Sequence, residues 1–183
     1  QNYVERCFKS GAMDFDDLLL KPIELFNSNQ RALQTYRKQF KYILVDEFQD
    51  TNKAQYEIVK FLSTPRTKVC VVGDDAQSIY GWRGAHIGNM LDFEKDFDKA
   101  EVFRLEQNYR STKTILRASD SVIKNNKGQI QKTLWTENND GEEMTIIRCA
   151  DEKDEAFQIS KKIKTVISEK KLLMSDLAIL YRI

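Results

Sequence analysis

The chain has 183 residues, 41% of them hydrophobic and 31% charged, which is enough apolar material for one domain or for parts of two. Its 29 lysines and arginines nearly balance its 28 acidic residues, so the molecule as a whole does not attract polyanions and any nucleic-acid contact must be local. One histidine and three scattered cysteines disfavour a zinc site and favour a reducing compartment. No apolar run approaches membrane-spanning length.

The first part of the chain has a helical pattern. It begins with Gln1 rather than methionine, inside a helix-like stretch, and we therefore expect a piece of a longer protein. The pattern over 15–26 predicts a helix that Asp14 caps and that Pro22 should kink. A short basic helix over 31–40 is expected next.

Two short apolar runs, 42–45 and 69–72, predict strands. Their unbroken apolarity is typical of a parallel sheet that is covered on both faces. The stretch between them predicts a helix over 51–62, capped by Thr51, so the three elements form a βαβ unit with a right-handed crossover. Acidic and amide side chains follow both strands, and ligands of open α/β sheets bind beyond the carboxyl ends of strands. We expect the functional site there.

The rest of the chain continues the α/β pattern. A helix is expected over 86–97, and a third strand over 102–105 that ends in another polar cluster. After a helix over 112–124 and a polar loop, a second βαβ pattern follows, with strands 144–149 and 177–180 around a helix at 151–170. We predict two domains, 1–110 and a truncated 111–183.

Asp46 and Glu47 stand together at the end of the first strand. An aspartate in this place, followed by glutamate, is the arrangement in which the first carboxylate holds Mg²⁺ and the second accepts a proton from an attacking water. The alternative is an ordinary solvated strand end, which is the commoner origin of such a pair.

The segment after the second strand carries Tyr80, Trp82 and Arg83 between glycines. Exposed aromatic rings beside a cation suit stacking on unpaired bases, whereas the alternative is that both rings pack beneath the loop. Tyr109 and Arg110 follow the third predicted strand. An arginine there could stabilise charge in phosphoryl transfer, or it could be a surface residue paired with a nearby glutamate.

Three segments resemble known motifs. Residues 46–52 read DEFQDTN, 73–85 read GDDAQSIYGWRGA and 105–111 read LEQNYRS, and they are similar to motifs II, III and IV of the UvrD/PcrA/Rep-type superfamily 1 DNA helicases. FDDL at 15–18 and LWTEN at 134–138 also resemble that family. The resemblance implies a partial RecA-like (P-loop NTPase) parallel sheet with flanking helices, followed by the start of a second RecA-like domain.

The resemblance also implies a site for ATP with Mg²⁺. Asp46 would coordinate the metal, and Glu47 would activate the hydrolytic water. Gln77 would sense the γ-phosphate, Tyr109 would stack on adenine, and Arg110 would contact the γ-phosphate. We expect Glu47, Gln77 and Arg110 to gather around a single pocket.

For the partner, the resemblance implies single-stranded DNA and its junctions with duplex DNA. Tyr80 and Trp82 would stack on bases, and Arg83 would link the DNA site to the nucleotide site. Members of the family are 3′–5′ translocases and helicases of repair or replication, where accessory proteins are possible partners. A membrane is not expected as a partner, and we expect a cytoplasmic location.

One element of the family pattern is missing. The chain has no G-x-x-x-x-G-K-[ST] loop, and Lys9-Ser10-Gly11 lacks its glycines, so we expect the isolated chain to be inactive although the parent hydrolyses ATP. The sequence is also compatible with the motor subunit of a helicase–nuclease complex, with a non-catalytic DNA-binding module, or with a metal-dependent nuclease that uses Asp46, Glu47 and Asp50.

Overall fold

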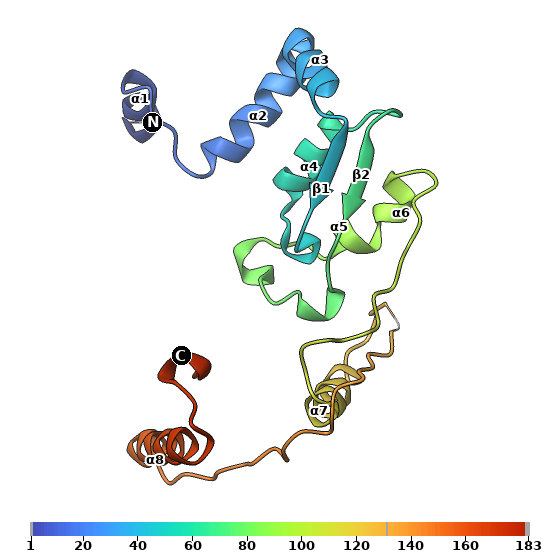
Figure 1. Cartoon of the computed structure of the whole chain (residues 1–183). Helices are drawn as coiled ribbons and strands as arrows, with labels where there is room; N and C mark the ends of the chain where they lie inside the picture. The colour runs from blue at the N-terminus through green and yellow to red at the C-terminus, as the bar shows by residue number, and fades with distance from the viewer. Residues whose placement is uncertain (1, 131, 182–183) are drawn as a thin grey trace. The chain divides into compact units, whose positions relative to one another are not determined.

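The computed structural model describes residues 2–130 and 132–181. The chain divides into two compact units, one formed by 1–108 with 119–135 and the other by 109–118 with 136–183, and each is described by itself (Figure 1). The domain division that the sequence suggests after residue 110 stays a prediction. Within the described ranges, no helix has both the length and the apolar character that crossing a membrane requires.

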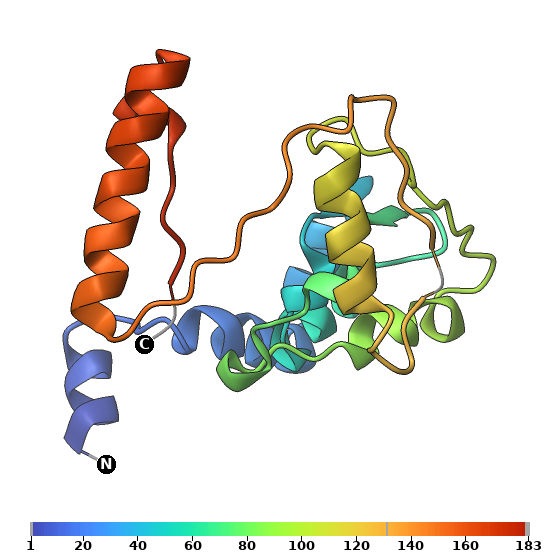
Figure 2. The same cartoon turned by 90° about the horizontal axis from the view of Figure 1, so that it is seen from below.

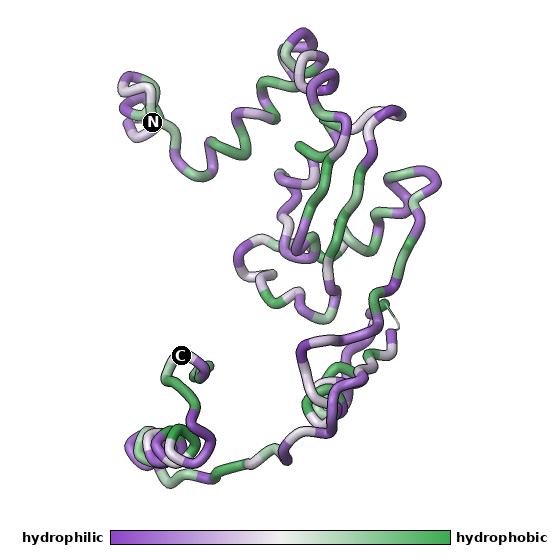
Figure 3. Tube along the Cα trace, viewed as in Figure 1, coloured by the Kyte–Doolittle hydropathy of each residue, from purple (hydrophilic) through white to green (hydrophobic). Residues whose placement is uncertain are grey.

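A two-stranded parallel sheet lies in the first unit and confirms the predicted α/β class. Strand β1 (Tyr42–Val45) pairs with β2 (Lys68–Val71) in the register Tyr42↔Lys68 to Val45↔Val71. Helix α4 (Lys53–Leu62) connects them, as the βαβ pattern predicts. Figure 3 shows both strands as apolar segments of the trace.

The start of α4 differs from the prediction. Its N-cap is Asn52, whose side chain accepts a bond from the Gln55 backbone N–H while the Gln55 side chain accepts one from the Asn52 N–H. This reciprocal arrangement satisfies two backbone donors at once. The predicted cap at Thr51 is wrong because the Thr51 hydroxyl donates instead to the Phe48 carbonyl, at 2.7 Å.

The sheet is not covered on both faces, which corrects a second prediction. Along β1 the side chains alternate between exposed and half-buried, and Tyr42 and Leu44 are 71% and 77% exposed. Helix α4 lies on one side of the two strands (Figures 1 and 2). The unbroken apolar run therefore does not by itself show how many faces are covered within this unit.

Three helices precede the sheet: α1 (Asn2–Lys9), α2 (Asp17–Ser28) and α3 (Gln30–Gln39). Helix α2 begins two residues later than predicted and continues through Pro22. Asp14 nevertheless accepts a bond from the Asp17 backbone N–H, at 2.8 Å. Helices α2, α3 and α4 pack together, with the buried Phe26 ring 5.7 Å from that of Tyr36 and 6.0 Å from that of Phe61.

A second hydrophobic cluster lies beside the end of β1. The single turns η1 (Phe48–Asp50), η2 (Asp75–Gln77) and η3 (Gly81–Arg83) are followed by two short helices, α5 (Gly88–Leu91) and α6 (Phe93–Asp96). The sequence predicts one helix here, but it divides at Asp92, whose conformation is non-helical. Phe48 is fully buried, and its ring lies 5.6 Å from Tyr56 and 5.7 Å from Phe93.

The third predicted strand, 102–105, is wrong. Phe103 and Leu105 are 78% and 81% exposed, and in the part of the chain that the structure describes the nearest ladder is a single parallel bridge between Gln107 and Trp135. A strand requires a partner for its backbone groups, and this apolar run has none within the first unit.

The second unit is helical. It contains α8 (Glu152–Lys170) and the turn η4 (Met174–Asp176), while α7 (Lys113–Ile123) spans the boundary between the units. The predicted strands at 144–149 and 177–180 are wrong, because these segments form no strand in the described range. Figure 2 shows the chain after α8 turning back alongside that helix.

Candidate functional site

Asp46 and Glu47 form the turn that leads out of β1. Both side chains are exposed, and Glu47 has left-handed backbone angles of φ 48° and ψ 43°. This conformation costs a non-glycine residue about 1–2 kcal/mol, and it is held by two hydrogen bonds. The Glu47 N–H donates to Asp46 Oδ1 and the Glu47 carbonyl accepts from the Asp50 N–H, both at 2.9 Å. The turn thus places the Glu47 carboxylate at the strand end on a backbone in a left-handed conformation.

Gln49 joins this turn to the segment that follows β2. Its side chain is 1% exposed. Its Nε2 donates to Glu47 Oε2 at 2.7 Å, and its Oε1 accepts from the Asp74 N–H at 3.0 Å. A Cβ at Gly73 would lie only 2.7 Å from that Oε1, so this close approach requires glycine. Sequence reasoning missed Gln49, although its place beside the buried Phe48 is a usable signal.

The Asp74 carboxylate collects donors from three directions. It accepts from the Ala76 N–H at 3.0 Å, from Gln77 Nε2 at 2.8 Å and from Lys132 Nζ. Burial acts to raise the pKa of Asp74, but the hydrogen bonds from Lys132 and Gln77 outweigh it and hold the pKa below its ordinary value. The side chain of Gln77, a predicted site residue, is therefore bonded to the carboxylate of Asp74, and Gln49 is bonded to the backbone N–H of the same aspartate.

Two residues that are distant in sequence, Ile130 and Lys132, are bonded to this turn through Asp75. Asp75 is buried, and it accepts from the Ile130 N–H at 2.7 Å and from Lys132 Nζ at 3.4 Å. Nothing in the spacing of the sequence brings residues 130 and 132 to residues 74 and 75, so the role of Lys132 was missed. Its only local signal is its position beside the LWTEN segment.

The aromatic loop lies between two anchors on the segment that follows β1. At its start the Ser78 hydroxyl donates to the Gln49 carbonyl at 3.3 Å, and at its end the His86 N–H donates to the Thr51 carbonyl at 2.9 Å. The buried Asn89 adds a bond from its side chain to the same Thr51 carbonyl, at 3.1 Å. The loop is thus attached at both ends to the turn that carries Glu47.

Within this loop the rings face solvent. Trp82 is 75% exposed and Tyr80 is 39% exposed. The Arg83 guanidinium lies 4.5 Å from the Trp82 ring centroid and 5.4 Å from that of Tyr80, which is the geometry of a cation–π contact. The structure therefore offers an exposed aromatic surface with a cation stacked on it, rather than rings packed beneath the loop.

Tyr109 and Arg110 belong to the second unit. Both are exposed, and Asn138 holds their segment because its Nδ2 donates to the Tyr109 carbonyl at 3.2 Å and to the Ser111 carbonyl at 3.1 Å. Glu47 and Gln77 both lie in the first unit, where Gln49 and Asp74 connect them through hydrogen bonds. The gathering of Arg110 with them stays a prediction.

The strand-end carboxylates can be compared with what a metal needs. In the described ranges no group of three or more histidine, cysteine, aspartate or glutamate residues is placed to hold a metal ion. Mg²⁺ makes a smaller demand, since it keeps several waters and takes one or two carboxylates together with substrate phosphates. The exposed Asp46 fits that requirement.

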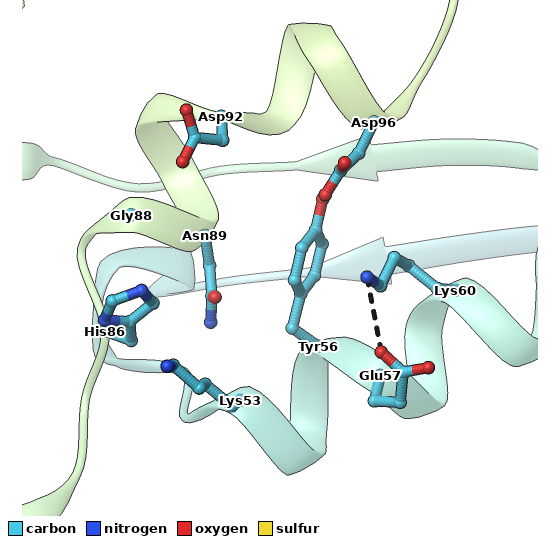
Figure 4. Close-up of a pocket in the computed structure, with 9 residues that line it drawn as sticks. All are labelled: Lys53, Tyr56, Glu57, Lys60, His86, Gly88, Asn89, Asp92 and Asp96. Carbon is cyan, nitrogen blue, oxygen red and sulfur yellow. Dashed lines mark hydrogen bonds and ion pairs between the residues drawn. The ribbon is translucent and has the colours of Figure 1, made fainter.

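A separate hollow lies between α4 and the α5–α6 segment (Figure 4). Its volume is about 230 Å³, and none of the predicted site residues lines it. Basic and acidic side chains face it in similar number: Lys53, Lys60 and His86 against Glu57, Asp92 and Asp96. Tyr56 crosses it and donates to Asp96 Oδ2 at 2.7 Å. The pKa of Tyr56 is raised, mainly by burial and secondly by this hydrogen bond to Asp96.

The amino-acid sequence matches the profiles of one protein family over nearly its whole length. The profile of the UvrD/REP helicase N-terminal domain matches residues 1–98, and that of the UvrD-like helicase C-terminal domain matches residues 103–183.

Individual relatives agree with these profiles. The chain is 49% identical over 181 residues to the ATP-dependent DNA helicase PcrA of Bacillus subtilis, and 50% identical over 181 residues to that of Staphylococcus aureus. It is 47% identical over 182 residues to the DNA helicase II of Rickettsia typhi. The alignments cover 98–100% of this chain but only 24–28% of each relative, so the chain spans about a quarter of the length of the curated relatives that it matches.

Proposed function

The chain belongs to the UvrD/REP helicase family, and we propose that it forms part of the motor of an ATP-dependent DNA helicase that moves 3′–5′ along single-stranded DNA. The observation that carries the proposal is the joining of two strand ends. Gln49 binds both the carboxylate of Glu47 and the backbone of Asp74, and the same short segment anchors a loop with exposed aromatic rings. Because the proposed nucleotide site and the proposed DNA site are both bonded to the segment that contains Gln49, a change at one site can be transmitted to the other.

The nucleotide half of the proposal uses the side chains at the strand ends. Asp46 would hold Mg²⁺, which when bound neutralises charge on the phosphates of ATP. Glu47 accepts the proton of the attacking water, and Gln77, which donates to the Asp74 carboxylate in this structure, turns from it to donate to the γ-phosphate. In the second unit, Tyr109 offers an exposed ring for adenine, and Arg110 supplies positive charge for the γ-phosphate.

The DNA half uses the aromatic loop. Tyr80 and Trp82 stack on unpaired bases, which contributes about 1–3 kcal/mol per base. Arg83, already stacked on both rings, keeps positive charge beside the DNA backbone. Single strands and their junctions with duplex DNA are the proposed substrates. The loop is anchored on the Glu47 segment at both ends. A change at the nucleotide therefore shifts the loop, and this shift moves the protein along the DNA strand.

The isolated chain is proposed to be inactive, because it has no phosphate-binding G-x-x-x-x-G-K-[ST] loop. ATP turnover by the 183-residue chain, measured with and without single-stranded DNA, tests this. No turnover is expected, and DNA-stimulated hydrolysis would overturn the proposal. A cytoplasmic location is also proposed, since Cys7, Cys70 and Cys149 are all free thiols.

The role of Glu47 is tested in the full-length protein. Glu47→Gln removes the proton acceptor but keeps the size of the side chain, so ATP binding should persist while DNA-stimulated turnover falls by at least about 10²-fold. The matched control is Glu57→Gln, because Glu57 is a half-buried glutamate on α4 that pairs only with Lys60 at 3.2 Å among the ion pairs of the described residues. Normal turnover in Glu47→Gln, with ATP binding intact, would remove Glu47 from this role.

A further inference from the structure

We propose that Gln49 is a positioning residue that orients the Glu47 carboxylate toward the attacking water and links it mechanically to Gln77. This inference rests on the proposed function, because it assigns a support to the proton acceptor of that reaction. Gln49 itself touches neither the nucleotide nor the water, and it acts through Glu47.

The first argument is that the amide of Gln49 has a single possible orientation. The Asp74 backbone N–H can only donate, so the atom 3.0 Å from it must be the amide oxygen. The amide nitrogen then necessarily faces Glu47 Oε2, at 2.7 Å. The side chain therefore donates to Glu47 and cannot flip without losing both bonds, and at 1% exposure no solvent is at hand to replace them.

The second argument is that Glu47 needs a support. Its side chain is exposed, and its backbone holds a left-handed conformation. Among the described residues, the bond from Gln49 is the one hydrogen bond or ion pair that an oxygen of the Glu47 carboxylate makes with another side chain. A glutamate with three free torsions samples many positions, whereas a hydrogen bond from a buried, fixed amide selects one of them. Reaction rates depend steeply on such placement, and an error of about 1 Å costs up to ~10²-fold.

The third argument is the continuity of the chain of contacts. Gln49 holds the backbone of Asp74, and the carboxylate of Asp74 holds Gln77 Nε2 at 2.8 Å. When Gln77 turns to a γ-phosphate it leaves this carboxylate, which keeps its bonds from the Ala76 N–H and from Lys132, and the altered set of bonds lets Asp74 shift against Gln49. The position of Glu47 thereby responds to the terminal phosphate through two intervening side chains.

The test uses two substitutions in the full-length protein. Gln49→Met removes both bonds at similar volume. Gln49→Glu keeps the acceptor for the Asp74 N–H but replaces the neutral amide donor with a carboxyl group that either repels the Glu47 carboxylate or shares a proton with it. For both variants we expect kcat for ATP to fall by about 10- to 100-fold while KM stays within about threefold. The control is Glu57→Gln on α4, which alters an ion pair with Lys60 and leaves the Gln49 amide in place. Its kcat should be unchanged.

A second measurement separates positioning from mere structural support. Because Gln49 acts through Glu47, Gln49→Glu should cause no further loss of the residual turnover once Glu47→Gln is present. A fixed loss in both backgrounds would mean that Gln49 only supports the fold, and this would overturn the inference. The melting temperature of each variant is measured in parallel, and Gln49→Glu decides the question if Gln49→Met does not fold. Normal turnover in Gln49→Glu also overturns the inference, whereas normal turnover in Glu47→Gln overturns the proposed function.

Discussion

Trp82→Ala provides the sharpest test of the DNA half of the proposal. The ring is 75% exposed, so its removal opens no cavity. It costs the fold the contact with Arg83, at most about 1 kcal/mol for an exposed cation–π pair, and the contact with the Tyr80 ring, whose centroid lies 6.5 Å away. If the ring stacks on one base, the variant loses about 1–3 kcal/mol of binding free energy. At 1.4 kcal/mol per tenfold, this is a rise of roughly 5- to 150-fold in the Kd for single-stranded DNA.

The assay is fluorescence anisotropy of a labelled oligothymidine, titrated with the full-length protein at one fixed salt concentration, because phosphate contacts make affinity strongly salt-dependent. Two controls bracket the result. Trp82→Phe keeps a ring and should retain most of the affinity. Ile79→Ala truncates another exposed apolar side chain of the same loop, 70% exposed, and should leave the Kd within about twofold.

An unchanged Kd in Trp82→Ala, with both controls normal, would refute the stacking argument. An equal loss in Ile79→Ala would refute it differently, since it would show a general apolar contact instead of a ring-specific one. In either case the exposed position of Trp82 would need a different explanation.

Two further outcomes concern the free energy of unfolding of the 183-residue chain, measured by urea titration. Phe48→Ala should lower it by about 3–5 kcal/mol, because Phe48 is fully buried against the rings of Tyr56 and Phe93; a loss below about 1 kcal/mol would contradict the described packing. Hydrogen bonds hold the pKa of Asp74 below its ordinary value of 3.8, so its stabilising contribution is present above pH ~4 and is lost as the pH falls through the folded-state value. Lys132→Met removes one cause of the lowered pKa and should flatten the fall in stability between pH 5 and pH 3, whereas an equally steep fall would show that Lys132 does not hold Asp74.

The parts of the fold that local patterns determine could be predicted. Strands β1 and β2 and helix α4 lie within thirty residues of one another, and their apolar runs and the polar residues after them were sufficient to place them. The expected strands at 102–105, 144–149 and 177–180 failed for one reason. A run of apolar residues favours an extended chain, but only a partner strand turns it into a sheet.

The candidate site divides in a similar way. Asp46 and Glu47, which stand directly after a strand, could be picked out because strand ends are where ligands bind, whereas the role of Gln77 came from the family resemblance. The residues that support them could not. Gln49 was missed because an uncharged amide does not by itself indicate a functional site. Lys132 and Asn138 bind residues that lie 27 to 58 positions away in the chain. Such contacts follow from the tertiary fold and have no periodic signal in the sequence.

Gly73 has a consequence for anyone who exchanges segments between members of this family. Because a methyl group at this position would meet the Gln49 amide oxygen at 2.7 Å, the glycine after β2 and the glutamine after β1 make up one interlocking unit built from two separate stretches of sequence. Consider a chimaera that takes the segment with Gln49 from this protein but has a residue larger than glycine at position 73. The larger side chain displaces the Gln49 amide. The two stretches are best transplanted as a pair.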